Sequence, residues 1–145
     1  MKAVIQRAKE AVVKVETEVI GEIEKGLVVL LGVGEDDQQQ DVEYLVDKTV
    51  NLRIFANQEG KMDFSALDLD LEVLIIPQFT LYGDCSEGRR PDFNQAAGPT
   101  KAKQLYQDYV QAVQESGLEV ATGRFGAMME VELVNDGPVT IVLDS

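Results

Sequence analysis

The sequence contains no histidine and no tryptophan, and it has a single cysteine, Cys85. Without histidine, a Ser-His-Asp triad and a Cys-His dyad are both excluded within this chain. A zinc site would have to combine carboxylates with one thiol, which is not a usual zinc ligand set, so no metal is expected. A lone cysteine also excludes an internal disulfide framework and favours a reducing compartment, so we expect a cytoplasmic protein.

Cationic side chains are scarce as well, because 13 lysines and arginines stand against 26 aspartates and glutamates, for a net charge of −13. Proteins that coat long nucleic acids neutralise phosphates with Lys and Arg, so this class is disfavoured. A protein that grips only a few nucleotides remains possible. Long apolar runs are missing too, and Gln6 and Arg7 interrupt the first one too early for a signal peptide. We therefore expect no membrane segment.

The glycine-rich runs that cradle nucleotide cofactors are also absent. Neither Gly-x-x-x-x-Gly-Lys-Ser/Thr nor Gly-x-Gly-x-x-Gly occurs, so no cofactor is expected. The chemistry that remains open uses hydroxyls, carboxylates, Lys and Arg, backbone amides and groups of the substrate itself. A chain of 145 residues without repeats or linkers is expected to form one domain, residues 1–145.

Hydrophobic patterns predict many strands and two helices. The segment 26–33 is apolar on both faces, which predicts a central strand covered on both sides. Apolar residues recur with helical spacing from Val42 to Val50, and a second helix is predicted to begin at Pro99 and to end before Gly117. Further strands are predicted at 3–7, 11–16, 19–24, 52–55, 71–76, 129–133 and 139–143, with a turn at 135–138. These elements predict an α/β (α+β) fold in which two helices pack outside a mixed or antiparallel sheet or an open barrel.

Two short segments are candidates for a site. Gln78-Phe79-Thr80 follows an apolar strand, and strand ends commonly carry sites whose backbone amides can bind an oxyanion. Its simpler interpretation is an ordinary strand in which Phe79 packs inside. Gly137-Pro138 is either a plain turn or a rigid backbone wall beside a pocket.

Other residues have two interpretations each. The basic run Gly88-Arg89-Arg90-Pro91 either receives phosphate or forms a solvated loop. Arg7 lies among apolar neighbours, as a paired structural arginine or as a brace for a functional loop. Met128 and Met129 are expected in the core rather than in a ligand pocket.

Taken in order along the chain, these segments closely resemble one family, the D-aminoacyl-tRNA deacylases. Members of this family are editing enzymes that cleave D-amino acids from mischarged tRNA. The resemblance runs nearly end to end. Its matching segments are 3–7, 26–33, 51–55, 60–62, 78–82, 88–91, 122–127 and 134–140.

The resemblance implies a site and a way to judge chirality. Gln78, Phe79 and Thr80 correspond to the end of the family's Ser-Gln-Phe-Thr motif, which lines the active site. Gly137 and Pro138 correspond to its Gly-cisPro motif. In this family the protein is a homodimer, and the Gly-cisPro motif of one subunit enters the partner's pocket, where its backbone oxygens exclude an L side chain. Glycine has no side chain to exclude, so glycyl-tRNA is implied as a second substrate.

The resemblance also assigns supporting residues. Arg7 matches the arginine that helps to hold the Gly-Pro motif, and Asn135 belongs to the same substrate-binding group. Phe125 and Met129 fall where the pocket for the terminal adenosine is expected. One departure is Pro77, which replaces the usual serine before Gln78 and removes a backbone N–H. The implied partner is the aminoacyl-tRNA 3′ end.

Two routes for ester hydrolysis remain open. Thr80 attacks as a nucleophile, or water attacks with help from the ribose 2′-OH while backbone amides near Phe79 and Thr80 hold the oxyanion. The second route is favoured because no side-chain base is evident to deprotonate Thr80. Two other classes stay open: a non-catalytic module that binds RNA 3′ ends, and a small-molecule esterase or D-amino-acid peptide hydrolase.

Overall fold

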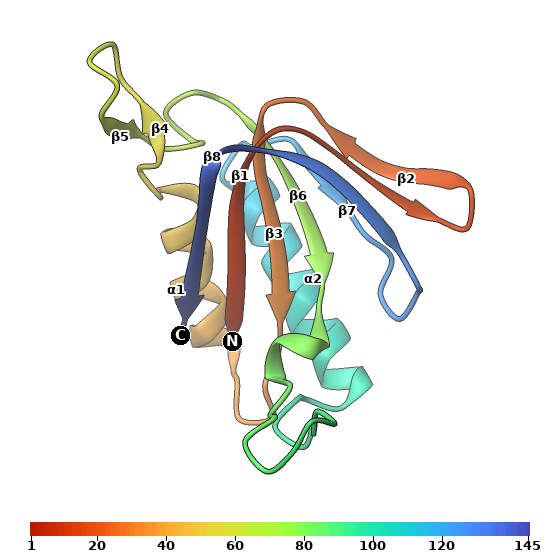
Figure 1. Ribbon diagram of the computed structural model, residues 1–145. Coiled ribbons are helices and arrows are strands. Elements are labelled where there is room, and N and C mark those ends of the chain that lie inside the picture. The colour runs from red at the N-terminus through yellow and green to blue at the C-terminus, as the bar shows by residue number, and fades with distance from the viewer.

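The computed structural model describes residues 1–145, and Figure 1 labels its elements in chain order. The strands are β1 (Lys2–Val15), β2 (Glu18–Ile23), β3 (Gly26–Gly32), β4 (Phe55–Ala56), β5 (Met62–Phe64), β6 (Glu72–Pro77), β7 (Val120–Thr122) and β8 (Glu130–Asp144). The helices are α1 (Gln39–Val50), α2 (Pro99–Glu115) and a short 3₁₀ helix, η1 (Phe79–Tyr82).

Strand β3 lies in the interior and is buried on both faces, as its sequence predicts. Leu27, Val29 and Leu31 belong to the larger core cluster, between the sheet and the helices. Val28 belongs to a smaller cluster of seven buried residues on the opposite face. The same alternation continues in β6, so these two parallel strands separate two apolar layers.

The sheet is mixed and strongly curled. Its order is β2-β1-β3-β6-β7, and β8 pairs with the other edge of β1. β1 is antiparallel to β2, β3 and β8, whereas β6 runs parallel to both β3 and β7. β1 pairs with β3 as far as Ala8 and with β2 from Ala11 onward, so the sheet bends between these two residues of β1. It curls until β2 meets β7, where a Cβ added to Gly21 would lie 2.8 Å from the carbonyl oxygen of Thr122.

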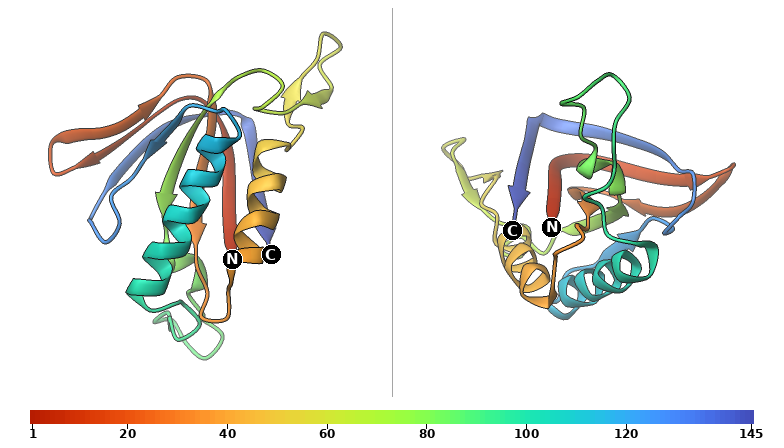
Figure 2. Two further views of the ribbon diagram at one scale, coloured as in Figure 1. Left: turned by 180° about the vertical axis from the view of Figure 1, so that it is seen from behind. Right: turned by 90° about the horizontal axis from the view of Figure 1, so that it is seen from below.

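Both main helices cover one face of this sheet (Figures 1 and 2), which confirms the predicted fold class. The two helices are joined through a buried hydrogen bond in which the Tyr109 hydroxyl donates to Thr49 Oγ1 at 2.6 Å. α2 begins at Pro99, as predicted, and Gly117 follows its end with a φ of +100°, a conformation that favours glycine. None of the helices combines the length and the apolar character that a membrane-spanning helix needs.

Several predicted strand boundaries are wrong. Segments 3–7 and 11–16 form one continuous strand, β1. The strand predicted at 52–55 is absent, because only Phe55 and Ala56 pair, and they pair with β5 in a separate two-stranded ribbon. Met128 is 91% exposed, so its predicted place in the core is wrong, whereas Met129 packs against the smaller cluster.

The predicted turn at 135–138 does not reverse the chain. β8 is a single strand whose two halves pair with the same partner: Val134 lies opposite Glu10, and Thr140 lies opposite Gln6. The register shifts around Ala8, where Asn135 to Pro138 form an irregular bend. These turn-forming residues therefore form an irregular bend within one strand. The chain does not reverse, because both halves of β8 pair with β1.

Candidate active site

The Gln78-Phe79-Thr80 segment forms the turn that ends β6. The Gln78 amide donates to the carbonyl of Leu31 at 2.8 Å, and η1 begins at the next residue. The Phe79 side chain is 58% exposed and meets the ring of Phe93 edge to face at 5.1 Å. The simple interpretation of this segment as a strand with Phe79 packed inside is therefore wrong. The chain instead presents Phe79 and Thr80 at the surface.

The Thr80 hydroxyl has an amide as its neighbour and no base. Gln78 Nε2 donates to Thr80 Oγ1, and no carboxylate or amine contacts this oxygen. The backbone amides of Phe79 and Thr80 stand at the start of a helical turn, where N–H groups have no partner within the helix. Neither is among the donors to turn and loop carbonyls. The segment thus places two amides of a helix start beside one hydroxyl.

Tyr82 fixes the far end of this turn. Its hydroxyl donates to Asp37 Oδ2 at 3.1 Å. Burial, and then the nearby negative charge of Asp37, raise the pKa of Tyr82 far above its ordinary value, so the hydroxyl stays protonated as a donor. The amide of Gly34 donates to the same carboxylate at 2.5 Å. Hydrogen bonds through Asp37 therefore anchor the far end of η1 to the loop that contains Gly34.

The Gly137-Pro138 segment lies in the bend of β8, and its peptide bond is cis. Arg7 reaches across from β1: Nε donates to the carbonyl of Asp136 at 2.8 Å and lies 3.6 Å from its carboxylate. Arg7 Nη1 donates to the carbonyl of Ile54. Arg7 thus ties the bend to the segment after α1, which favours the brace interpretation over an isolated ion pair.

Asn135 holds the other side of this bend. Its Oδ1 accepts from the Val139 amide at 2.7 Å, and its Nδ2 donates to the Val139 carbonyl at 3.1 Å. Gly137 has a φ of +153°, and a Cβ there would lie 2.7 Å from the backbone nitrogen of Val139. Only glycine fits this position without moving the backbone.

Phe125 and Met129 lie on the segment after β7, next to the end of β6. The Phe125 ring centroid is 6.2 Å from that of Tyr106 in α2. Met129 Sδ accepts from the Arg124 amide at 3.3 Å and lies against Gly123. A Cβ on Gly123 would lie 3.2 Å from Pro77 Cδ, so this segment borders the Gln78 turn.

Within one chain, the two motifs lie at opposite ends of the sheet. Pro77 and Ala3 both pair with Leu31, whereas Arg7 pairs with Leu27, four residues away. At about 3.3 Å per residue, this offset is about 13 Å along the strands. β8 and β6 are three strand spacings apart, which adds about 14 Å across the sheet. In Figure 1 the turn after β6 is at the bottom and the bend of β8 is at the top.

The structure thus brings together Gln78, Phe79 and Thr80 with Phe125 and Met129 at one end of the sheet. It brings Arg7 and Asn135 to Gly137 and Pro138 at the other end. A single chain does not assemble both motifs into one pocket. Sequence reasoning missed Phe93, whose only signal is its place in a polar loop, and Asp136, whose carbonyl rather than carboxylate receives the 2.8 Å hydrogen bond from Arg7.

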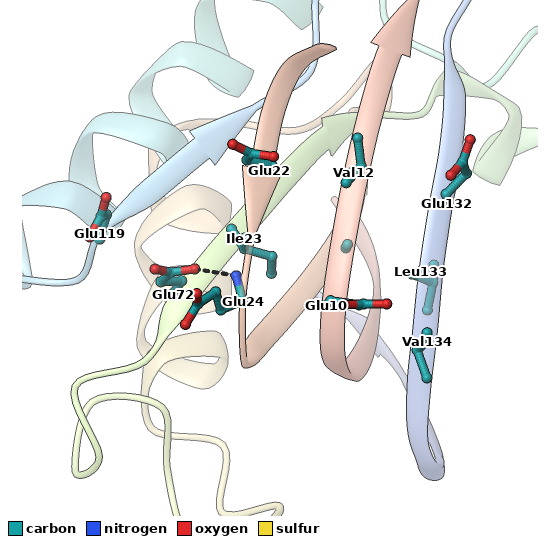
Figure 3. A pocket seen from close by; sticks show the side chains of 11 residues that line it. Glu10, Val12, Glu22, Ile23, Glu24, Glu72, Glu119, Glu132, Leu133 and Val134 are labelled. Atoms are coloured by element: carbon teal, nitrogen blue, oxygen red, sulfur yellow. Dashed lines mark hydrogen bonds between the residues drawn. The ribbon is translucent and has the colours of Figure 1, made fainter.

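One cavity at the sheet belongs to neither motif. It measures about 610 Å³ and is bordered by β1, β2, β8 and the starts of β6 and β7. Figure 3 shows the six glutamates of its lining, Glu10, Glu22, Glu24, Glu72, Glu119 and Glu132. Two of them are engaged: the Glu24 amide donates to Glu72 Oε2 at 2.5 Å, and Lys14 Nζ donates to Glu132 Oε1 at 2.6 Å. No group of three or more acidic or thiol side chains has a geometry that could hold a metal ion.

Comparison with known proteins gives matches over the whole chain. The sequence profile of the D-Tyr-tRNA(Tyr) deacylase family matches residues 4–144. The D-aminoacyl-tRNA deacylase of Thermosipho africanus is 57% identical over 145 residues, which are 100% of this chain and 97% of that protein. The D-aminoacyl-tRNA deacylase of Brevibacillus brevis is 52% identical, and the match covers 100% of both chains.

Two solved structures share the fold. One, described as c-Myc DNA Unwinding Element Binding Protein, has a TM-score of 0.93 at 40% identity and covers 100% of this chain and 99% of its own. The other, described as a probable eukaryotic D-amino acid tRNA deacylase, has a TM-score of 0.88 over 99% of this chain and 98% of its own. Its 17% identity makes it evidence for the fold alone.

Proposed function

The chain belongs to the D-Tyr-tRNA(Tyr) deacylase family, and from this premise we propose that it is an editing hydrolase. It hydrolyses the ester of D-aminoacyl-tRNA to a free D-amino acid and tRNA. The observation that carries the proposal is the family match over residues 4–144, together with a relative that is 57% identical over the full chain. A substrate of this kind is expected to be met in the cytoplasm.

The geometry of Gln78-Phe79-Thr80 supports water as the nucleophile. The side chain hydrogen-bonded to the Thr80 hydroxyl is the amide of Gln78, which cannot remove its proton. In the proposed reaction, water attacks the ester carbonyl carbon and the amides of Phe79 and Thr80 stabilise the oxyanion. The ribose 2′-OH assists, and the 3′ oxygen departs with a proton. This chemistry needs no histidine.

The proposed oxyanion donors can be tested one at a time. Phe79 is the first residue of η1, a position that tolerates proline. Phe79→Pro removes the amide and the ring, whereas the control Phe79→Ala removes only the ring. Phe79→Pro should lose about 100- to 1,000-fold in kcat relative to Phe79→Ala, the range found when one oxyanion donor is removed. Equal rates for the two variants would exclude this amide as a donor.

The role of the RNA is tested with a modified substrate. D-Aminoacyl-tRNA ending in 2′-deoxyadenosine lacks the proposed assisting hydroxyl. Its cleavage should be about 100-fold slower or more, which is the usual contribution of a positioned acid or base. Cleavage at the normal rate would count against the RNA-assisted route.

Selectivity is proposed to come from exclusion by the Gly137-Pro138 backbone. Arg7 and Asn135 hold this segment on both sides, so it can act as a fixed wall. A D side chain points away from this wall, and an L side chain collides with it. Glycine has no side chain to exclude, so glycyl-tRNA is a proposed second substrate. Comparing the rates of D-, L- and glycyl-tRNA cleavage by the purified protein tests both statements.

A homodimer is proposed to supply the wall. In one chain, the bend of β8 lies roughly 13 Å along and 14 Å across the sheet from the Gln78 turn, too far for one aminoacyl group to touch both. A second copy related by a two-fold axis can place its own Gly137-Pro138 beside that turn. Each pocket then uses Gln78–Thr80 of one chain and Gly137-Pro138 of the other.

A mixing experiment separates a shared pocket from a pocket within one chain. Gly137→Ala chains are expected to cleave L-aminoacyl-tRNA, and Phe79→Pro chains are expected to be inactive with an intact wall. In a mixed dimer with shared pockets, the active Gln78 turn of the Gly137→Ala chain faces the intact wall of the Phe79→Pro chain. This pocket rejects the L form, and the other pocket is inactive. A tenfold excess of Phe79→Pro chains should therefore reduce L-aminoacyl-tRNA cleavage about tenfold once subunits have exchanged. Unchanged cleavage after exchange would exclude the shared pocket.

Two other functions are separated by the same assays. A non-catalytic module that binds RNA 3′ ends would protect the ester of D-aminoacyl-tRNA. A small-molecule esterase would cleave free D-amino-acid esters as fast as the tRNA-linked ester.

A further inference from the structure

A second cavity lies between α2 and the segment after β7. It measures about 430 Å³, within the range of ligand pockets. Its lining includes Lys103, Gln107, Gln111, Gln114, Arg124 and Phe125. We call this cavity the α2 groove.

The α2 groove differs in charge from the chain as a whole. Two cations, Lys103 and Arg124, line it, and no carboxylate does, in a chain of net charge −13. Both side chains are exposed, and neither is among the cations that pair with a carboxylate within 4.0 Å. Their charges are therefore available to a ligand.

The acidic cavity of Figure 3 is the opposite case. Six glutamates and no cation line it, so it repels phosphates. Of these two cavities, only the α2 groove can accept a polyanion. Its glutamine amides both donate and accept hydrogen bonds, as the edges of nucleic-acid bases do.

The α2 groove also adjoins the proposed active site. Gly123 belongs to its lining, and the Gly123 amide donates to the Ile75 carbonyl of β6 at 2.9 Å. Ile75 is three residues before Gln78 on the neighbouring strand. An RNA strand whose 3′ end lies at the Gln78 turn can therefore continue past Phe125 into the groove.

We propose that the α2 groove binds the single-stranded nucleotides that precede the terminal adenosine of tRNA. Lys103 and Arg124 bind their phosphates, and the glutamines of α2 face their bases. The proposal rests on the proposed function, because that function places an RNA 3′ end at the Gln78 turn. It explains how a strongly acidic protein holds tRNA, since the contact is confined to a few nucleotides.

The test measures binding of an uncharged acceptor-stem minihelix that ends in single-stranded CCA. Its Kd is determined by fluorescence anisotropy for wild type, Lys103→Gln, Arg124→Gln and the double variant. The control is Lys101→Gln, which removes the same charge from the same helix turn. Lys101 lies outside the groove, and its Nζ donates to the Glu35 carbonyl. Thermal melting verifies that each variant is folded.

Each groove variant should raise Kd about two- to fivefold, as expected for exposed charge pairs, and Lys101→Gln should match wild type. The slope of log Kd against log salt should fall by about 0.7 for each phosphate that is no longer neutralised, or about 1.4 in the double variant. A minihelix without the single-stranded end should show no difference between wild type and the double variant. As a second measure, Gln107→Glu keeps both cations but adds a carboxylate, and it should also weaken binding of the CCA minihelix.

Other results overturn the proposal. The first is an equal Kd for wild type and the double variant. The second is a rise in Kd for Lys101→Gln as large as that for the groove variants. The third is no binding of the CCA minihelix by wild type. If wild type cleaves D-aminoacyl-tRNA while the double variant binds normally, the groove assignment fails and the proposed function stands. If binding depends on Lys103 and Arg124 but no ester is cleaved, the groove stands and the proposed function fails.

Discussion

Replacing Gly137 with alanine should destabilise the protein and relax its selectivity together. The added Cβ would lie 2.7 Å from both the backbone nitrogen and the Cγ2 of Val139, and 3.4 Å from Arg7 Nη2. The Val139 side chain can rotate away, but its backbone nitrogen cannot. The φ of +153° is also unfavourable for alanine. The bend must therefore move.

The size of the effect follows from these contacts. An L residue held in a sparsely populated backbone region costs about 1–3 kcal/mol, and the clash adds to this, so we expect a loss of about 2–3 kcal/mol in the free energy of unfolding. For a domain of this size, that corresponds to a fall in Tm of about 4–12 °C. Urea unfolding and thermal melting measure both quantities.

A matched control isolates the crowding at this position. Gly60 has a φ of +78°, and a Cβ there would meet nothing within 4 Å. Gly60→Ala should therefore cost only about 1–2 kcal/mol, the penalty for the left-handed backbone alone, and should leave selectivity intact.

The assay for selectivity compares cleavage of D- and L-aminoacyl-tRNA carrying the same amino acid. Gly137→Ala should retain D cleavage and gain L cleavage, because the displaced wall no longer meets the L side chain. If Gly137→Ala has the stability of Gly60→Ala and still rejects the L form, the reasoning about the wall is refuted.

Three further predictions concern single side chains and their hydrogen bonds. Thr80→Ala should keep kcat within about tenfold of wild type, since no base activates this hydroxyl, and near-complete loss of turnover would support a nucleophilic threonine instead. Arg7→Met should lower the free energy of unfolding by about 2–3 kcal/mol because two backbone carbonyls lose their donor; urea unfolding should find Arg7→Lys in between. Tyr109→Phe should cost about 1–2 kcal/mol because it breaks a buried hydrogen bond. The control Tyr44→Phe, at a side chain 48% exposed, should be neutral in the same melt.

Much of the fold could be predicted from local pattern. Leu27, Val28 and Val29 are apolar in succession because both faces of β3 are covered. The two helices were predictable for a similar reason, since their buried residues recur every three or four positions. Where burial is periodic, the periodicity is visible in the sequence.

Local pattern failed where distant partners decide the structure. Leu52, Arg53 and Ile54 look like a strand, but no strand of the main sheet lies beside them. Asn135 to Pro138 look like a hairpin turn, but β1 continues alongside and β8 stays in the same ladder. Turn chemistry predicts a local bend, and only long-range pairing decides whether the chain reverses.

The candidate site divides in the same way. The residues alone establish that any chemistry proceeds without histidine, and the motifs identify Gln78–Thr80 and Gly137-Pro138 as the segments of interest. The folded chain is needed to see that these segments lie at opposite ends of one sheet, and that Lys103 and Arg124 line a groove free of carboxylates. The physical reason is that residue chemistry is encoded position by position. Distances between segments depend on how strands far apart in the sequence pair.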